Sequence, residues 1–393
     1  MNWKKEPLGK ICKTTSGGTP SRKNQSYYQN GTIPWVKSGE LENNIITTSE
    51  EFITEEGLLN SSAKIFPAGT LLIALYGATI GKLAFLGIDA ATNQAVCGIF
   101  QNENVSLKYL YYYLLFQRPN LIKQGVGGAQ PNISQTILKK LEISYPDSIT
   151  EQQRIVARIE ELFSELDKAV DTLKTTKEQL TVYRRAVLKD AFSDFEKKDS
   201  IRNLTMVVTS GSRGWAKYYS NSGALFVRIG NLTHSGIDID FRDIQHITPP
   251  DNAEGVRTRL QPNDVLVSIT ADLGSIGFVS EKVEEAYINQ HIALVRFQNP
   301  VQGRFMAWYL RSEYGQKDLL KNKRGGGKLG LGLDDIRDTP VPIVDDITAT
   351  EIVDKVEEQL SVCDSIEKTV DTALAQADAM RQSILKQAFE GKI

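Results

Sequence analysis

The sequence is poor in cysteine and has no long apolar run. Its three cysteines, Cys12, Cys97 and Cys363, are scattered and include no Cys-x-x-Cys pair, which argues against a disulfide framework or a zinc site. No apolar stretch reaches the roughly 18 residues that a membrane span needs, and the first residues lack the apolar segment of a signal peptide. We therefore expect a cytoplasmic protein that does not enter a membrane.

Motifs that would carry catalysis are also missing. The segment 77–83 resembles a phosphate loop, but it is one residue short between its glycines and ends in Leu83 where Ser or Thr is needed. The segment 325–330 matches a dinucleotide fingerprint by its letters alone, because it follows a predicted helix rather than a strand. No histidine lies beside a second ligand at metal spacing, and no Asn-Pro-Pro-aromatic segment occurs. We expect no metal, no cofactor and no catalytic site in this chain.

An excess of charge is absent as well, since the formal net charge is −2. The charge is unevenly distributed, because two globular segments are slightly basic and the two helical segments that follow them are acidic. A protein that recognises a nucleic-acid sequence needs only a local basic face. Residues 321–328, in which basic side chains alternate with glycines, would supply one. An ordinary solvated charge run is an equally good interpretation of that segment alone.

What the chain does contain is a long internal repeat. Residues 183–192 (YRRAVLKDAF) recur as residues 380–389 (MRQSILKQAF). Further matched segments are 155–161 with 352–358, 33–41 with 224–232, and 93–94 with 289–290. A repeat of this length is a duplicated domain rather than a solenoid unit. The sequence predicts two globular modules, residues 1–148 and 197–346, each followed by a long helix, residues 149–196 and 347–393.

Both helical segments are amphipathic. Their apolar residues recur in alternating four- and three-residue steps over about five heptads, which is typical of a coiled coil. The residues expected at the helix interface are Ile155, Ile159, Leu162, Leu166, Leu173, Leu180, Val187, Ile352, Val356, Ile366, Val370, Met380 and Ile384. Thr150 and Thr348 are expected to cap the two helices. Because the halves repeat, we expect antiparallel pairing within one chain about an approximate two-fold, with a homodimeric coil as the alternative.

The modules contain short β-rich runs separated by long loops, which predicts an α+β fold with a mostly antiparallel sheet. Arg and Lys match the edge of guanine and Asn and Gln match that of adenine, so such side chains on loops are candidate DNA contacts. The candidates are Arg22, Lys23, Lys37, Tyr76, Lys82, Gln94, Gln130, Asn132, Arg213, Arg228, Asn231, Gln290, His291, Arg324 and Lys328. For each one alone, a turn or strand-end residue is the alternative. The repeated pair Asn93-Gln94 and Asn289-Gln290 is more typical of a framework.

Several segments together carry a resemblance over the whole chain. They are GGTPSR (17–22), IPWVKSGEL (33–41), GTLLIALYGATIGK (69–82), ATNQAV (91–96), GGAQPNIS (127–134), EQQRIVARIEELFSELD (151–167) and SILKQAFEGKI (383–393). In this order, and with the duplicated plan of module and helix, the chain resembles the specificity subunit of type I restriction–modification enzymes. The second module departs from the pattern, since residues 211–214 replace the GGTPSR loop and Thr348-Ala349 replace Glu151-Gln152.

The resemblance implies two target recognition domains joined by an intrachain antiparallel coiled coil. Each domain would recognise one half of a bipartite, asymmetric site on double-stranded DNA, and the coil would set the spacer between the halves. Two modification subunits would dock on the helices and bring S-adenosylmethionine for adenine N6 methylation. Restriction subunits would add ATP- and Mg-dependent translocation and cleavage, in defence against phage. The alternative is a scaffold that bridges proteins through its two modules and binds no DNA.

Overall fold

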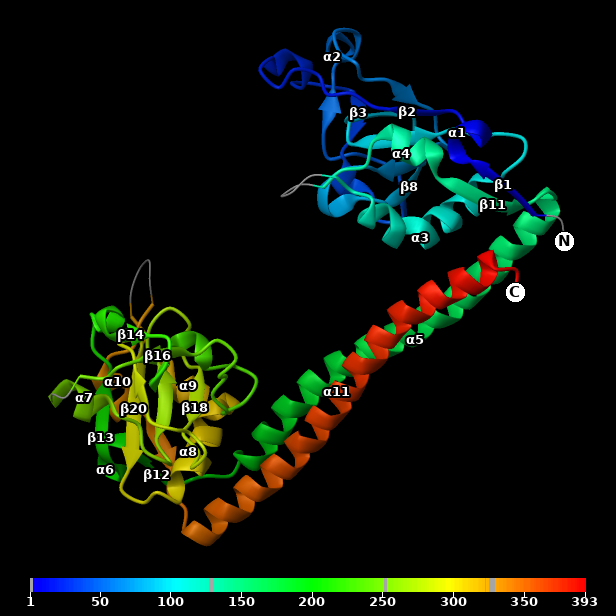
Figure 1. Cartoon of the computed structure of the whole chain (residues 1–393). Coiled ribbons are helices and arrows are strands. Elements are labelled where there is room, and N and C mark those ends of the chain that lie inside the picture. The colour runs from blue at the N-terminus through cyan, green and yellow to red at the C-terminus, as the bar shows by residue number, and fades with distance from the viewer. Residues whose placement is uncertain (1–2, 127–130, 251–252, 322, 325–328) are drawn as a thin grey trace. The chain divides into compact units, whose positions relative to one another are not determined.

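The computed structural model describes residues 3–126, 131–250, 253–321, 323–324 and 329–393. The chain divides into two compact units, one made of Met1–Leu173 and Thr372–Ile393 and the other of Lys174–Asp371. Each unit contains one β-rich module and parts of the two long helices, α5 (Ile149–Ala191) and α11 (Asp346–Phe389). In Figure 1 the first module is coloured blue to cyan and the second green to yellow.

The first module is built from three sheets. A two-stranded ribbon pairs β1 with β11, a larger sheet has the order β2-β10-β7-β8-β4, and a third has the order β5-β3-β9-β6. Most neighbours are antiparallel, but β3 runs parallel to β9 and β4 runs parallel to β8. The strands are β1 (Trp3–Pro7), β2 (Thr14–Ser16), β3 (Ile33–Val36), β4 (Asn44–Ile46), β5 (Phe52–Ile53), β6 (Ile65–Phe66), β7 (Leu71–Ala74), β8 (Leu83–Leu86), β9 (Ala90–Thr92), β10 (Val96–Ile99) and β11 (Glu142–Pro146).

The helices of the first module are α1 (Leu8–Ile11), α2 (Glu55–Leu59), α3 (Leu107–Lys123) and α4 (Gln135–Lys140). The last turn of α11 packs into the core of this unit. The ring of Phe389 lies 5.3 Å from that of Tyr109 and 4.9 Å from that of Tyr113, both on α3, in edge-to-face geometry. Leu385 and Ala388 belong to the same buried cluster. The end of the chain is therefore part of the first module's core.

The second module repeats this arrangement. Its ribbon pairs β12 with β21. A four-stranded sheet, which matches the larger sheet of the first module, has the order β13-β20-β17-β18, and the third sheet, also four-stranded, has the order β14-β16-β15-β19. Strands β15 and β19 are parallel, as β3 and β9 are in the first module. The strands are β12 (Lys198–Ser200), β13 (Thr205–Ser210), β14 (Tyr219–Ser220), β15 (Ala224–Val227), β16 (Gln245–Ile247), β17 (Val265–Ser268), β18 (Ile276–Phe278), β19 (Ala286–Ile288), β20 (Ile292–Phe297) and β21 (Pro340–Pro342).

The helices of the second module are α6 (Ile201–Leu204), α7 (Ala253–Thr258), α8 (Gln302–Arg311), α9 (Glu313–Leu319) and α10 (Leu333–Arg337). Helices α8 and α9 are separated at Ser312, whose hydroxyl accepts from the backbone N–H of Gly315 and so caps α9. The two modules thus share the strand order β2-β10-β7-β8, which is β13-β20-β17-β18 in the second, and they differ at the edges of their sheets. The predicted α+β fold with tandem modules and two long helices is confirmed.

One tight contact is also common to both modules. A Cβ on Gly17 would lie 2.1 Å from the carbonyl oxygen of Thr92, and a Cβ on Gly211 would lie 2.3 Å from the carbonyl oxygen of Asn289. Only glycine leaves room for such a backbone approach. In both modules, the loop that follows the first strand of the larger sheet is therefore fixed beside the end of a strand of the third sheet.

Within each unit, α5 and α11 run antiparallel and side by side (Figure 1). In the first unit Arg381 forms an ion pair with Asp167. In the second, the Nη2 atom of Arg184 lies 2.6 Å from Oδ1 of Asp364 and 3.0 Å from Oε2 of Glu367. The repeat places Arg184 and Asp364 at the positions of Arg381 and Asp167 in the matched helices, so the same ion pair occurs twice. Intrachain antiparallel pairing is thus confirmed.

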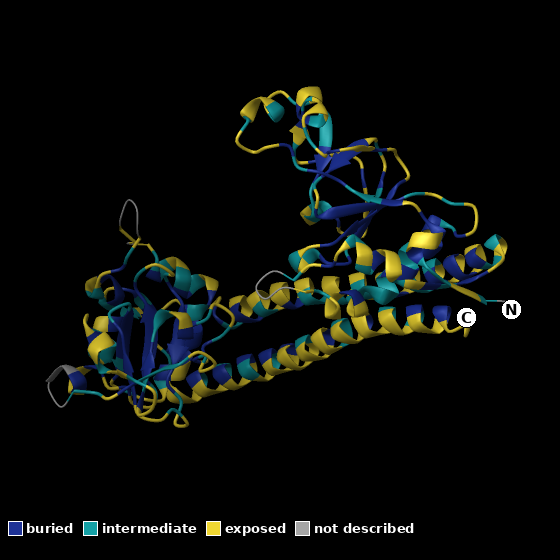
Figure 2. Cartoon of the chain, turned by 45° about the horizontal axis from the view of Figure 1, so that its top comes forward, coloured by how far each residue is buried: buried dark blue, intermediate teal, exposed yellow. Residues whose placement is uncertain are grey.

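The helix interface differs from the predicted one at alternate positions. Buried and half-buried residues recur at Val156, Ile159, Phe163, Leu166, Val170, Leu173, Lys177, Leu180, Arg184 and Val187, and at Val353, Val356, Leu360, Cys363, Glu367, Val370, Leu374, Ala377, Arg381 and Ile384. Figure 2 shows this alternation of buried and exposed residues along both helices. Every second interface residue therefore lies one position later in the sequence than predicted, as Val156 does beside Ile155 and Phe163 does beside Leu162.

Two predicted interface residues are wrong as a result. Ile366 is 40% exposed and Met380 is 53% exposed, because Glu367 and Arg381 occupy the interface positions beside them. The remaining predicted interface residues are buried or half-buried, and Ile155 is buried in the core of the first module. Charged side chains hold these interface positions because each has an ion-pair partner on the other helix.

The predicted helix caps are also wrong. The hydroxyl of Ser148 accepts from the N–H of Glu151, and the carboxylate of Asp345 accepts from the N–H and hydroxyl of Thr348. Both helices therefore begin before the predicted threonine caps. The N–H groups at the start of α11 lower the pKa of the Asp345 carboxyl, as expected for an anion at a helix N-terminus.

The three cysteines are buried and unpaired by disulfides. Burial raises the pKa of the Cys12 and Cys97 thiols to about 11, so both are neutral at physiological pH. Among the residues that the structure describes, no helix combines the length and the apolar character needed to span a bilayer.

Candidate nucleic-acid interface

Several candidate residues of the first module meet where two parallel strands end. Lys37 follows β3 and Gln94 follows β9, and the N–H of Asn93 donates to the carbonyl of Val36, the last residue of β3, at 3.0 Å. The 17–18 loop joins them, since the indole N–H of Trp35 donates to the carbonyl of Gly18 at 3.0 Å. The fold therefore brings together candidates from three distant parts of the sequence.

Arg22 and Lys37 are held in place by one carboxylate. Glu51 lies 2.7 Å from Nη1 of Arg22 and 3.0 Å from Nζ of Lys37. The guanidinium of Arg22 also stacks 4.3 Å from the ring centre of Tyr28 and 4.8 Å from that of Trp35. Hydrogen bonding to Arg22, and then to Lys37, holds the pKa of the Glu51 carboxyl below its ordinary value. The site thus presents two cations in fixed positions.

A second group in the first module lies at the Tyr76 loop. Tyr76, which is 41% exposed, pairs with Asn132 through an isolated β-bridge, and the N–H of Gly77 donates to the carbonyl of Pro131 at 2.7 Å. Lys82, three residues beyond η3 (Gly77–Thr79), lies 3.9 Å from Glu42. Lys23 is exposed next to Arg22. The candidate Gln130 lies outside the described residues.

The second module places Arg228 and Gln290 as the first module places Lys37 and Gln94. Arg228 follows β15 and Gln290 follows β19, and the N–H of Asn289 donates to the carbonyl of Val227 at 3.2 Å. The guanidinium of Arg228 donates to the Asp243 carbonyl at 3.3 Å. Arg213 is exposed on the loop beyond Gly211.

Asn231 is a structural residue, and its predicted base contact is wrong. The side chain is 3% exposed, its oxygen accepts from the N–H of Arg228 at 2.8 Å, and its nitrogen donates to the carbonyls of Asp240 and Asp243. In the first module Glu40 takes the same role, since its carboxylate accepts from the N–H of Lys37 at 2.7 Å. Both residues fix the backbone that carries a cation.

Arg324 and His291 lie near the same β-bridge of the second module. Arg324 and Thr270 both bridge to Gly330, and the hydroxyl of Thr270 lies 2.5 Å from Nδ1 of His291. The Nη2 atom of Arg324 lies 2.9 Å from Oδ1 of Asp335, which is 7% exposed. Thr270, His291 and Arg324 line one open pocket of about 460 Å³. Lys328 lies outside the described residues.

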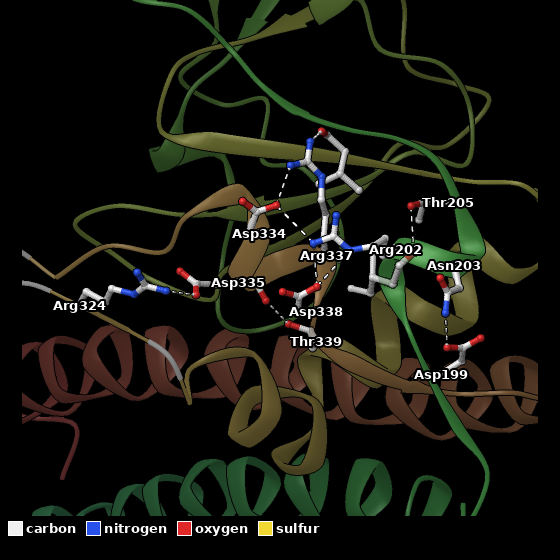
Figure 3. A network of polar contacts seen from close by, with 12 residues as sticks. Asp199, Arg202, Asn203, Thr205, Arg324, Asp334, Asp335, Arg337, Asp338 and Thr339 are labelled. Carbon is white, nitrogen blue, oxygen red and sulfur yellow. Dashed lines mark hydrogen bonds and ion pairs between the residues drawn. The ribbon is translucent and has the colours of Figure 1, made fainter.

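The carboxylate that holds Arg324 is itself held by a polar network around α10 (Figure 3). The N–H of Gly332 donates to Oδ2 of Asp335 at 2.8 Å, and Thr339 donates to the carbonyl of the same residue at 2.8 Å. Arg202 pairs with Asp338 at 2.8 Å from the neighbouring helix α6. The anchor of Arg324 is therefore rigid, which reduces the entropy lost on binding an anion.

The sequence did not single out the carboxylates Glu51, Asp243 and Asp335, because each lies far in the chain from the cation that it holds. Within the described residues, His, Cys, Asp and Glu side chains form no group of three that could hold a metal ion. The exposed candidates are instead cations and amides on loops, a composition that suits phosphate oxygens and base edges.

Comparison with known proteins finds one kind of relative. Residues 1–181 match the model of the type I restriction modification DNA specificity domain. Over 423 aligned positions the chain is 25% identical to the StySPI specificity subunit of Salmonella potsdam, an alignment that covers 100% of this chain and 89% of that one. The chain is thus similar to type I restriction–modification specificity subunits. It is also 28% identical over 208 residues to the EcoR124I/EcoR124II specificity subunit of Escherichia coli, covering 52% of this chain and half (50%) of that subunit's length.

Two solved structures share the fold of this chain. One is a chain described under "Structural basis underlying complex assembly and conformational transition of the type I R-M system", with a TM-score of 0.79, 17% identity and coverage of 100% and 98%. The other is the HsdS subunit from Thermoanaerobacter tengcongensis, with a TM-score of 0.58, 17% identity and coverage of 100% and 97%. At this identity the likeness concerns the fold, which is the tandem module and helix plan described above.

Proposed function

We propose that this chain is the DNA sequence-specificity subunit of a type I restriction–modification complex, and that each module recognises one half of a bipartite site. The observation that carries this proposal is the common frame with different side chains at equivalent loop positions. Lys37 corresponds to Arg228, and the residue after the repeated glutamine is Ala95 in one module and His291 in the other. A common frame with different contact residues suits two unlike half-sites, so we expect a non-palindromic target.

The cations of the site support binding to the DNA backbone. Arg22, Lys37 and Arg324 are held by carboxylates before any ligand arrives, so their positions need little reorganisation. Each phosphate contact releases a condensed counterion, so affinity should fall steeply as salt concentration rises. Discrimination between sequences then comes from a few contacts with base edges in the major groove.

The helices supply surfaces for partner subunits. Tyr183 is 48% exposed and Ile366 is 40% exposed, and each immediately precedes one of the paired interface residues Arg184 and Glu367. In the matched helices, Met380 occupies the position of Tyr183 and is 53% exposed. Exposed apolar side chains beside a coiled-coil interface are typical of surfaces that bind further helices. Two equivalent surfaces suit two copies of one partner, which we propose are the modification subunits.

Catalysis would then reside in the partners. The modification subunits would supply S-adenosylmethionine and transfer its methyl group to adenine N6, and restriction subunits would use ATP with Mg to translocate and cleave DNA. This chain would recognise the site and hold the subunits on it, in the cytoplasm. Half-sites recognised from one face of the duplex would lie about one helical turn, roughly 34 Å, apart.

The test is methylome sequencing of a host with this gene and with the gene deleted. We expect a bipartite adenine-methylated motif that disappears on deletion and returns on complementation. A parallel selection of random DNA by this chain with its modification subunit should enrich the same motif. A protein-bridging scaffold would enrich no sequence, and a motif that persists after deletion would contradict the proposal.

A further inference from the structure

A glutamine occupies the same place in both modules. Gln94 and Gln290 each follow an asparagine whose N–H donates to the last carbonyl of the neighbouring parallel strand, at 3.0 Å in the first module and 3.2 Å in the second. Gln94 is exposed and Gln290 is half-buried. Because the backbone is common to both modules, a difference in what the two amides present must come from their neighbours.

In the first module the amide is held by its oxygen. The hydroxyl of Thr19 donates to Oε1 of Gln94. Thr19 is fixed in turn by the loop before it, since the N–H of Gly18 donates to the carbonyl of Thr92 at 2.9 Å and Gly17 approaches the same carbonyl closely. With its oxygen engaged, Gln94 presents the two N–H groups of Nε2 as donors.

In the second module the amide is held by its nitrogen. Nε2 of Gln290 lies 2.8 Å from Nε2 of His291. An amide nitrogen can only donate, so the ring nitrogen accepts and the ring proton lies on Nδ1. From Nδ1 the ring donates to the hydroxyl of Thr270 at 2.5 Å. With one N–H engaged, Gln290 presents its carbonyl oxygen as a free acceptor and keeps a single N–H.

The residues that hold the amides have no counterpart in the other module. The residue after Gln94 is Ala95, which has no ring to accept from an amide, whereas the residue after Gln290 is His291. The loop position of Thr19, two residues beyond the close glycine, is Arg213 in the second module. The frame is thus the same, and the polarity of the amide is set by a different neighbour in each module.

We propose that Thr19 and His291 are positioning residues that bias two equivalent base-reading glutamines toward opposite hydrogen-bonding polarity. This inference rests on the proposed function. In the major groove guanine offers the two acceptors O6 and N7 and thymine the acceptor O4, whereas adenine and cytosine carry an amino donor. Gln94 therefore favours guanine, which has two acceptors, in its half-site, and Gln290 favours adenine or cytosine in the other.

Exchange of each glutamine for glutamate tests the polarity directly, because glutamate has the same shape and only accepts. The full chain would be produced with its modification subunit, and the methylated motif would be determined by sequencing. Gln290→Glu keeps the acceptor, and the His291 ring can hold the new carboxylate by carrying its proton on Nε2 while Nδ1 accepts from the Thr270 hydroxyl, so this variant should keep its base. Gln94→Glu replaces donors by acceptors, so guanine at its position should lose roughly tenfold to hundredfold in preference, the range for one bidentate contact. Both variants add one negative charge, so each controls for the other.

The neighbours give an independent measurement. Thr19→Val and His291→Phe keep the shape but remove the hydrogen bond, so each should relax one base in its own half-site and leave the other half unchanged. Thr19→Ser restores the hydroxyl, and His291→Gln places an oxygen near the former Nε2, so both should restore the preference. A residue with only a structural role would lower the amount of methylation without changing the motif.

Three results separate the possible failures. The inference is overturned if Gln94→Glu and Gln290→Glu give the same outcome. That outcome could be an unchanged motif, or an equal loss of methylation at all sequences, which is expected if the glutamines contact phosphates. Where Gln94→Glu abolishes methylation, an unchanged motif in Thr19→Val overturns it and a motif relaxed in one half-site supports it. A wild-type complex with no sequence preference would instead overturn the proposed function itself.

Discussion

The buried ion pair of the second module gives the sharpest prediction for stability. Asp264 is 1% exposed at its side chain, and its two oxygens lie 2.7 Å from Nε and 2.7 Å from Nη2 of Arg296. The N–H of Gln261 donates to the same carboxylate at 2.7 Å. Arg296→Met keeps the apolar stem but leaves a buried carboxylate without its counter-charge. We expect the free energy of unfolding to fall by about 3–5 kcal/mol, a large part of the roughly 5–15 kcal/mol of a typical domain.

The pH dependence has a definite sign. Burial raises the pKa of the Asp264 carboxyl above its ordinary 3.8, against the opposing effect of Arg296, so removal of the arginine raises it further. The folded variant then binds more protons than the unfolded chain from pH 3.8 upward. Its stability should therefore fall as the pH rises through this window and recover on acidification.

Urea denaturation of the full chain, followed by circular dichroism at several pH values, measures both effects. The control is Arg242→Met, because Arg242 pairs with Asp240 at 2.6 Å but is 90% exposed and should leave stability unchanged. The double variant Asp264→Leu with Arg296→Met should return close to wild type, within about 1 kcal/mol. A loss below about 1 kcal/mol for Arg296→Met, or a stability difference from wild type that becomes smaller as the pH rises, would refute the reasoning.

Three further predictions concern the helices and the loops. Tyr183→Asp and Ile366→Asp should leave the thermal unfolding of the chain unchanged but weaken its co-purification with the modification subunit, because both side chains are exposed beside the helix interface. Val370→Asp, which places a charge at a buried interface position, should instead lower the unfolding temperature by several degrees. Gly17→Ala should destabilise the first module and Gly39→Ala should not, as judged by limited proteolysis, since a Cβ meets the Thr92 carbonyl at the first position and nothing within 4 Å at the second.

Much of the fold could be predicted from the sequence because its signals are local. The short β-rich runs of the modules form strands, such as the apolar segments Ile33–Val36 (β3) and Ile292–Phe297 (β20). The repeat predicted the antiparallel pairing of α5 and α11. Few other structures fit a continuous apolar run bounded by turns, or a helix sequence that occurs twice in one chain.

The helix interface and the site could be predicted less well, for one physical reason. Arg184 and Glu367 are unfavourable at an interface singly and acceptable as a pair, and the sequence does not show which residues pair across a fold. The search for apolar steps therefore selected Ile366, its neighbour. In the same way, Asn231 is a residue type that commonly contacts bases. Its side-chain nitrogen instead donates hydrogen bonds to the carbonyls of Asp240 and Asp243, which makes it a structural residue.

The position of Phe389 in the core of the first module has a consequence for biosynthesis. The second unit, Lys174–Asp371, is continuous in sequence and has all its residues once they have left the ribosome. The first unit needs Thr372–Ile393, which are translated after the whole of the second unit, to complete the cluster around Tyr109. Although translation of the first unit begins before that of the second, its folding is completed later, because a domain closes only when all its parts are present. A stop codon between the two units, after residue 371, would thus leave the second unit intact and damage the first.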